Sequence, residues 1–288
     1  MNIKRKKISN GVKYPHTNFK HDLIKSENKG RSGYACLFKP IKFDGKIGRG
    51  ASPNFNEEKK FWKKGFKFVV GIDEAGRGSL AGPVVAGAVA INFKFKILNL
   101  KLIFNEPIFK KVRDSKMLSA KQREEIYNAL IKHPNIKWGI GIVSEKIIDK
   151  INILEATKLA MLKAVKDLEK KLRKPSVQKT HDREFSAQLV LVIDGNIKLD
   201  ESAFAKSFSE VKQKSIIKAD QKVFSCALAS IFAKVTRDAI MQKLHKKYPE
   251  YGFDIHKGYG TSHHFKMLKK HGVCKIHRKS FYPVSNIA

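Results

Sequence analysis

The chain of 288 residues carries 59 Lys and Arg against 26 Asp and Glu, a formal net charge of +33. Hydrophobic residues make up 42% of it, enough for a sizeable core, which excludes a wholly disordered protein. No apolar run approaches the ~20 residues of a membrane-spanning helix, and the basic N-terminus lacks the apolar stretch of a secretion signal. We therefore expect a cytoplasmic protein with no membrane contact.

The positive charge favours nucleic acid as the partner, because a polyanion neutralises it. AT-biased coding also enriches a chain in lysine and would give the same charge without a function. The function is therefore argued from candidate site residues. The three cysteines, Cys36, Cys226 and Cys274, are odd in number and far apart, which favours a reducing compartment over a disulfide framework.

The first 66 residues differ from the rest of the chain in charge and in hydrophobic periodicity. They hold 17 Lys and Arg against 5 Asp and Glu, a net charge of +12, without sustained periodicity. We expect a basic, largely irregular extension over residues 1–66, which could tether nucleic acid, act as an address or drift neutrally. A folded domain is expected over 67–245, followed by a helical and loop segment over 246–288.

Apolar runs alternate with helical patterns through the expected domain. A capping-box pattern, Ser119 to Gln122, opens a helix that ends near His133, and Asn152 is placed to cap another through Leu172. Residues 92–111 suggest a strand end and a surface loop, and 173–188 a polar break. This alternation predicts an α/β domain, with strands at 68–72, 84–91, 136–143, 189–193 and 215–218 and a further helix at 225–245.

Two adjacent acids, Asp73 and Glu74, stand at the end of the first apolar run. Neighbouring carboxylates repel one another unless a cation lies between them or one is protonated, so a divalent ion with oxygen ligands is an economical explanation. The alternative is a solvated turn. Gly76-Arg77-Gly78 follows and favours a ligand site, because glycines allow close backbone approach and arginine pairs with phosphate.

Two further acids occupy similar positions. Asp194 follows the run 189–193 and precedes a glycine, and Asp220 lies between a short apolar run and a helix. Taken alone, Asp194 is ordinary turn chemistry and Asp220 a helix N-cap. Together with Asp73 and Glu74 they form a set of carboxylates at strand ends in a basic surround. Such a set suits two Mg²⁺ or Mn²⁺ ions about 4 Å apart that hydrolyse a phosphodiester.

Residues 67 to about 284 resemble ribonuclease HII, a type 2 ribonuclease H, through a series of motifs in the family's order. The resemblance implies an RNase H-like fold, a mixed central sheet flanked by helices with a small helical C-terminal part. The motifs are GIDEAGRGSLAGPVV at 71–85, DSKMLS at 114–119, ILEAT at 153–157, IDGN at 193–196, ASIFAKVTRD at 229–238, YGF at 251–253, HKGY at 256–259 and HRKSF at 277–281.

The resemblance also implies a metal-dependent endoribonuclease. Its substrates would be RNA/DNA hybrids and duplex DNA with single embedded ribonucleotides, incised on the 5′ side to leave 3′-hydroxyl and 5′-phosphate ends. The corresponding role is ribonucleotide removal and RNA primer processing. We expect a monomer, while the choice of Mg²⁺ or Mn²⁺ and contact with a replication clamp stay open.

Residue by residue, the resemblance makes Asp73, Glu74, Asp194 and Asp220 the catalytic metal ligands. Gly76, Arg77 and Gly78 match the motif whose backbone reads the 2′-hydroxyl, the group that distinguishes RNA from DNA, and Tyr259 matches a tyrosine that stacks on the adjacent sugar. The remaining implied substrate contacts are Ser115, Lys116, Ser230 and Lys234. Lys257, Arg278 and Lys279 are expected to line the same basic groove as Lys234.

Several alternatives accompany this hypothesis. The separation between Asp194 and Asp220 exceeds the family pattern, and Asp238 is the other candidate; we expect Asp238 instead to cap or to pair with a base such as Lys234 or Arg237. The cluster His263, His264, His271, Cys274 and His277 lacks zinc-ligand spacing, so packing and phosphate contact are expected there. The competing functions are an RNase H-fold enzyme of continuous hybrids and a binding protein without catalysis.

Overall fold

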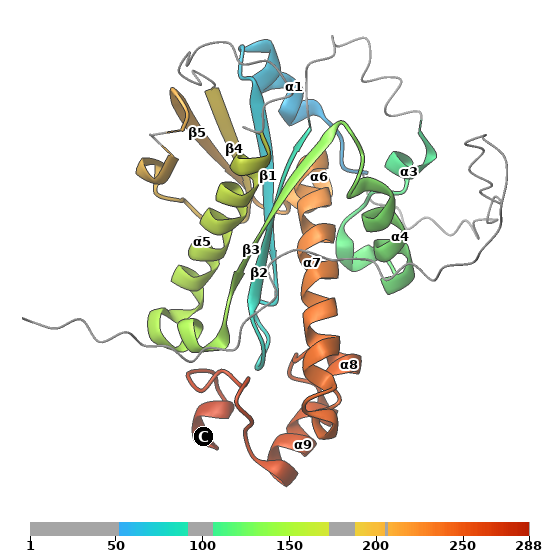
Figure 1. The fold of residues 1–288 in the computed structure, drawn as a ribbon, viewed down its shortest axis with the longest axis vertical. Coiled ribbons are helices and arrows are strands. Elements are labelled where there is room, and N and C mark those ends of the chain that lie inside the picture. Colours follow the sequence, from blue (N-terminus) through green and yellow to red (C-terminus); the bar gives the residue numbers. More distant parts are fainter. Residues whose placement is uncertain (1–51, 92–105, 173–187, 205–206, 288) are drawn as a thin grey trace, which may run out of the picture. The chain divides into compact units, whose positions relative to one another are not determined.

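Five strands form one mixed sheet in the part of the chain that the computed structural model describes, residues 52–91, 106–172, 188–204 and 207–287 (Figure 1). The strand order is β3-β2-β1-β4-β5. β2 pairs antiparallel with both β1 and β3, whereas β4 runs parallel to β1 and to β5. The strands are β1 (Phe68–Ala75), β2 (Val84–Ile91), β3 (Ile136–Val143), β4 (Gln188–Asp194) and β5 (Glu210–Ile216).

The parallel pairing of β1 with β4 decides where the acids meet. Ile72 of β1 is in register with Ile193 of β4, so the next residues, Asp73 and Asp194, come side by side. The carboxyl ends of parallel strands are the usual ligand-binding edge of such sheets. The sheet topology therefore carries two of the candidate acids to one edge.

Two long helices cover the two faces of the sheet, α5 (Glu145–Leu172) on one and α7 (Phe224–His245) on the other (Figure 1). Strand residues alternate between the two cores: Val84 packs with the α5 side and Val85 with the α7 side.

The shorter helices are α1 (Asn56–Lys63), α3 (Pro107–Lys110), α4 (Ala120–Leu130), α6 (Ala219–Lys222), α8 (Phe253–His256) and α9 (Ser262–His271), with single 3₁₀ turns at Ser115–Met117, Glu201–Phe204, Pro249–Tyr251 and Val284–Asn286. Within the described residues, none of the helices combines the length and apolar character needed to cross a membrane.

Strand glycines bring both helices unusually close to the sheet. A Cβ on Gly141 of β3 would lie 1.9 Å from the carbonyl oxygen of Ala160 in α5, and one on Gly87 of β2 would lie 2.5 Å from the carbonyl oxygen of Ala229 in α7. These are backbone contacts that no rotamer change can relieve. Only glycine fits at such positions.

Most predicted elements are present. β2 and β3 have the predicted bounds, and the capping box of α4 is confirmed, because Ser119 and Gln122 each accept the other's backbone N–H in their side chains. α5 begins earlier than predicted, at Glu145, but Asn152 interrupts it with φ 62° and accepts the N–H groups of Leu154 and Glu155. Asn152 therefore caps the second part of the helix, as predicted.

Two predictions need correction. The strand expected at 215–218 is β5, which begins at Glu210; it is an edge strand of half-buried polar residues, so it lacks the apolar run that marks β4. Residues 52–66, expected to be irregular, contain α1, and Phe55 and Phe66 on either side of it are buried. The helix was not predicted because its many lysines obscure the few apolar residues that pack against the domain. The rest of the expected extension, the loop from 92 to 105 and the polar break from 173 to 187 lie outside the described residues.

Replacing Gly141 by Ala should destabilise the fold, because the added methyl group must displace the backbone of α5. We expect the free energy of unfolding to fall by about 1–3 kcal/mol, measured by urea denaturation. Asn128→Ala on the exposed side of α4 is the control and should leave stability within about 0.5 kcal/mol of wild type. Equal stability of Gly141→Ala and wild type would contradict this packing.

Candidate active site

Three carboxylates from three elements converge at the carboxyl edge of the sheet. Asp73 of β1, Asp194 of β4 and Asp220 of α6 each offer one oxygen, and these oxygens all lie within 4.8 Å of one another. Asp73 and Asp220 are buried, and Asp194 is partly exposed. Three oxygen donors at this spacing match the ligands that hard divalent cations prefer.

Hydrogen bonds to the backbone hold these acids in place. Asp73 Oδ1 accepts the N–H of Glu74 at 2.7 Å, and Asp194 Oδ1 accepts the N–H of Ala219 at 2.6 Å. The second bond ties the end of β4 to the start of α6, so it fixes Asp220 relative to Asp194. The backbone therefore fixes how these acids lie relative to one another.

The electrostatics of the cluster favour a bound cation. Burial raises the pKa of Asp73 well above its usual value, and the carboxylates of Glu74 and Asp194 raise it further. Burial and the same Asp194 charge raise the pKa of Asp220 to about 6. Asp220 Oδ2 is buried without a hydrogen-bond partner in the described structure. A desolvated carboxylate oxygen that accepts no hydrogen bond and faces two other acids fits a divalent ion, which would offset their repulsion.

Among the described residues, Lys116 forms an ion pair with this cluster. Its Nζ lies 3.6 Å from Asp220 Oδ2, but the lysine side chain is 81% exposed. Ion pairs to such exposed lysines contribute little stability. Lys116 therefore offsets only part of the charge of the three acids.

Glu74 lies beside the three-carboxylate group and is not one of its members. Its Oε1 is 3.7 Å from Nη1 of Arg77. Burial and the Asp194 charge raise the pKa of Glu74, while Arg77 opposes the rise. Glu74 thus shares the field of the cluster, but its carboxylate is paired with the arginine of the glycine-rich loop.

The backbone of that loop is held by a buried guanidinium. Arg278 donates from Nη2 to the carbonyl oxygen of Gly76 at 2.7 Å, from Nη1 to that of Arg77 at 2.8 Å and from Nε to that of Gly82 at 3.0 Å. We expected Arg278 in the basic groove, and this is wrong. Its planar set of donors matches the carbonyls of a tight turn, which explains why it is buried.

A second buried arginine, Arg237, supports the same loop from α7. It donates to the carbonyl oxygens of Ala81, Pro83 and Lys257 at 3.0–3.2 Å. Gly76 has φ +89°, and a Cβ there would lie 1.8 Å from Arg237 Nε. Glycine is therefore required at 76 both by conformation and by contact with this guanidinium. Gly78 meets nothing within 4 Å, which leaves that side of the loop open.

Ser115 and Ser230, expected to contact substrate, are both buried. Their hydroxyl oxygens lie 2.8 Å apart, and the Ser230 hydroxyl donates to Asp73, which favours the charged carboxylate. The two serines therefore position the candidate metal ligand Asp73. Asp114, which had no assigned role, lies next to Asp220 instead: it accepts the N–H of Lys116 and the side-chain amide of Gln221, and its charge raises the pKa of Asp220.

Tyr259 is 37% exposed and lies beside two cations. Its ring centroid is 5.3 Å from Cζ of Arg237 and 5.7 Å from Nζ of Lys234. Lys234 itself forms an ion pair of 2.7 Å with Asp238. Asp238 therefore pairs with a base, as expected, and lies outside the three-carboxylate group.

Two histidines of the C-terminal part, His264 and His277, have packing roles. His264 and His277 are buried and joined through their Nε2 atoms at 3.0 Å. The backbone N–H of Cys274 donates to His277 Nδ1, and His264 Nδ1 contacts the carbonyl oxygen of Tyr259 at 2.9 Å. Burial lowers the pKa of both imidazoles to about 4. Neutral, buried rings of this kind brace the backbone of Tyr259.

Known proteins resemble this chain over most of its length. The sequence model of Ribonuclease HII matches residues 70–284. Ribonuclease HII of Chlamydia muridarum is 44% identical over 222 residues, which cover 77% of this chain and 85% of that protein. Ribonuclease HII of Acetivibrio thermocellus is 45% identical over 224 residues, which cover 78% of this chain and 73% of that protein.

Solved structures share the architecture. Ribonuclease H2 from Pyrococcus horikoshii has a TM-score of 0.54 at 26% identity, covering 76% of this chain and 96% of the other. A ribonuclease HIII solved with Mn²⁺ has a TM-score of 0.51 at 15% identity, covering 76% and 68%. The expected RNase H-like fold is thus confirmed. The chain belongs to the ribonuclease HII family and is a divalent-metal-dependent RNase H endonuclease that acts on RNA/DNA.

Proposed function

We propose that this chain incises duplex DNA on the 5′ side of a single embedded ribonucleotide, as well as the RNA of RNA/DNA hybrids, leaving 3′-hydroxyl and 5′-phosphate ends. The observation that carries the proposal is that Arg237 contacts both the glycine-rich loop and the ring of Tyr259. The loop itself begins directly after the acids of β1. The loop and Tyr259, which suit recognition of a sugar, therefore lie next to the acids, which suit cleavage of the adjacent phosphodiester.

Asp73, Asp194 and Asp220 are the residues that would hold the metal, with Glu74 beside them. Bound there, Mg²⁺ or Mn²⁺, in our proposal as two ions, would supply an activated water and stabilise the leaving oxygen. The protein supplies a rigid, partly desolvated oxygen cage. Lys116 lies at its open side, where its charge would favour the approach of phosphate.

Recognition of the ribonucleotide is assigned to the loop 76–78 and to Tyr259. Arg278 and Arg237 fix the loop backbone through carbonyl oxygens, which leaves backbone groups on the open side of Gly78 free to approach a 2′-hydroxyl. Tyr259 offers a half-exposed ring for stacking against the neighbouring sugar. Arg77 and Lys234 complete the proposed substrate contacts, and we propose that the protein acts as a monomer.

The direct test is incubation of duplex DNA carrying one ribonucleotide with the protein and Mg²⁺ or Mn²⁺. We expect a single incision 5′ of the ribonucleotide, with end chemistry checked by ligation and by phosphatase treatment. Cleavage of continuous hybrids alone would favour the related hybrid-specific enzyme. Tight binding of the duplex without any incision would contradict the proposal and favour a nucleic-acid-binding protein without catalysis.

Asp73→Asn should abolish cleavage, because it removes one of the three oxygen ligands while keeping the shape of the side chain. We expect a loss of at least about 100-fold in single-turnover rate, with duplex affinity by fluorescence anisotropy largely preserved. Glu124→Gln, an equivalent change on the exposed side of α4, is the control. Full activity of Asp73→Asn would refute the assignment of this ligand.

Tyr259→Ala should slow incision at single ribonucleotides, because it removes the stacking surface; base–aromatic stacking, worth about 1–3 kcal/mol per base, sets the scale. We expect a decrease of roughly 5- to 150-fold. Tyr259→Phe, which retains the ring, should keep most of the rate. The rates are compared under single-turnover conditions, and an undiminished rate in Tyr259→Ala would reject the stacking role.

A further inference from the structure

A short segment N-terminal to β1 is joined to the turn that carries Asp220. Asn54 accepts the N–H of Phe224 at 3.0 Å through its carbonyl oxygen and donates its own N–H to the carbonyl of Lys222 at 3.1 Å. Its side chain accepts the N–H of Asn56 at 2.9 Å, at the start of α1. Asn54 therefore links α1 to the chain immediately after Asp220.

The buried carboxylate of Glu58 strengthens this link. Its Oε1 accepts the backbone N–H of Ser225 at 2.9 Å and the Ser225 hydroxyl at 2.8 Å. Ser225 lies in the first turn of α7, where N–H groups lack partners within the helix, and Val223 at the N-cap position provides no side-chain bond. Glu58 thus supplies from α1 the hydrogen-bond acceptor that the first turn of α7 lacks, and burial raises the pKa of this carboxyl to about 7.

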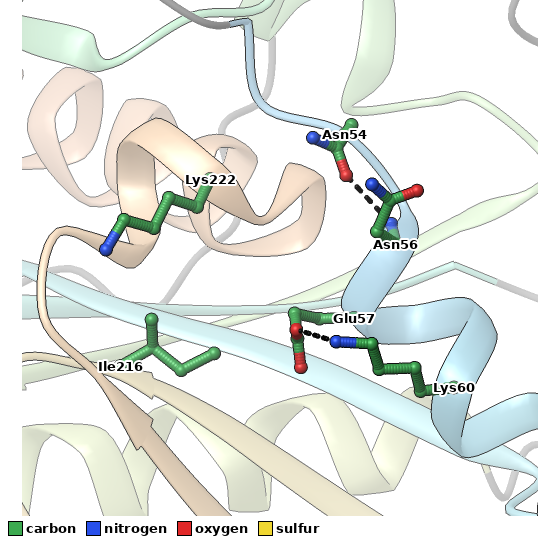
Figure 2. Close-up of a pocket in the computed structure, with 6 residues that line it drawn as sticks. All are labelled: Asn54, Asn56, Glu57, Lys60, Ile216 and Lys222. Atoms are coloured by element: carbon green, nitrogen blue, oxygen red, sulfur yellow. Dashed lines mark hydrogen bonds and ion pairs between the residues drawn. The ribbon is translucent and has the colours of Figure 1, made fainter.

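Apolar and ionic contacts hold α1 in the same place. The ring of Phe55 stacks on that of Phe224 with centroids 4.5 Å apart. Glu57 pairs with Lys214 of β5 and with Lys60 of its own helix. Figure 2 shows α1 opposite the end of β5 and the α6 turn, across a pocket lined by Asn54, Asn56, Glu57, Lys60, Ile216 and Lys222.

The turn that bears Asp220 needs such support, because α6 is a single turn of four residues. It begins after Lys218, which has φ +58°, and ends at Val223. On its first side, Ala219 is held by the carboxylate of Asp194. On its last side, the backbone bonds come from Asn54, which also forms an isolated parallel bridge with Val223.

We infer that residues 54–58 are a positioning segment for the third carboxylate of the site, and that Glu58 is its central positioning residue. The segment lies outside the 70–284 range matched by the family model. It acts on Asp220 through the first turn of α7 and through Lys222, without touching substrate. The inference rests on the proposed function, in which Asp220 is a metal ligand.

The test measures Mn²⁺ binding to the full-length protein without substrate, by calorimetry, in Glu58→Ala and in the isosteric Glu58→Gln. We expect the dissociation constant for Mn²⁺ to rise about tenfold in Glu58→Ala, the range found when residues that support metal ligands are removed, and less in Glu58→Gln. Excess Mn²⁺ should restore much of the cleavage rate. If Glu58→Ala does not fold, Glu58→Gln carries the test through the same measurement.

Two controls separate positioning from general loss of stability. Leu168→Ala removes a buried side chain of α5 on the opposite face of the sheet, in a core cluster that contains no residue of the 54–58 segment, so it should lower stability and leave Mn²⁺ affinity equal to that of wild type. Glu124→Gln removes an exposed carboxylate and should also leave the affinity unchanged. Wild-type affinity in both Glu58 variants, or an equal loss in Leu168→Ala, would overturn the inference.

Asp220→Asn distinguishes this inference from the proposed function. If Asp220→Asn weakens Mn²⁺ binding while the Glu58 variants do not, the metal site stands and only the positioning role of residues 54–58 is refuted. If Asp220→Asn binds Mn²⁺ like wild type, or wild type binds none, the assignment of Asp220 as a ligand fails and the inference fails with it.

Discussion

The structure is organised around the repulsion among three carboxylates that the sheet forces together. Asp73 and Asp194 are adjacent because β1 and β4 are parallel and in register at Ile72 and Ile193. Asp220 joins them through the bond between Asp194 and the N–H of Ala219. Desolvation makes this arrangement costly in the absence of a cation. A protein that maintains such a cluster through backbone bonds holds a site already shaped for metal.

A second set of buried charges lies on the other side of the glycine-rich loop. Arg237 and Arg278 are buried, and the hydrogen bonds described for both guanidiniums go to backbone carbonyls. Carbonyl acceptors satisfy the donors without neutralising the charge, so these arginines act as rigid braces. The loop is thereby held through its carbonyl oxygens, and the Arg77 side chain pairs with Glu74, which suits a backbone that must discriminate one hydroxyl group.

Sequence patterns were informative where the chemistry is local. The apolar runs of β2 and β3 and the capping box at Ser119 gave correct elements, because each depends on neighbouring residues. The acids were found from their places after apolar runs. By contrast, α1 and the early part of β5 were missed, since their Lys-rich surfaces mask short apolar contacts.

Roles that depend on distant partners could not be deduced from spacing. Nothing around Arg278 in the sequence indicates that its donors meet the carbonyls of Gly76 and Arg77, and nothing around Glu58 indicates Ser225. Both residues read as surface charges in a chain with 59 Lys and Arg. In a chain so rich in charged residues, the sequence does not distinguish buried charged side chains from solvated ones. The fold does, because it shows which partners they meet.

The net charge of +33 acquires a more specific meaning from this arrangement. Excess lysine draws a polyanion towards the protein over distances of about a Debye length, ~10 Å at 0.1 M salt, whereas the three carboxylates repel phosphate at contact. A cation between acid and phosphate at the end of the approach makes these opposite demands compatible. The exposed Lys116, 3.6 Å from Asp220, is too solvated to serve in that place. The long-range attraction and the short-range repulsion therefore both lead to a divalent ion as the link between this site and its substrate.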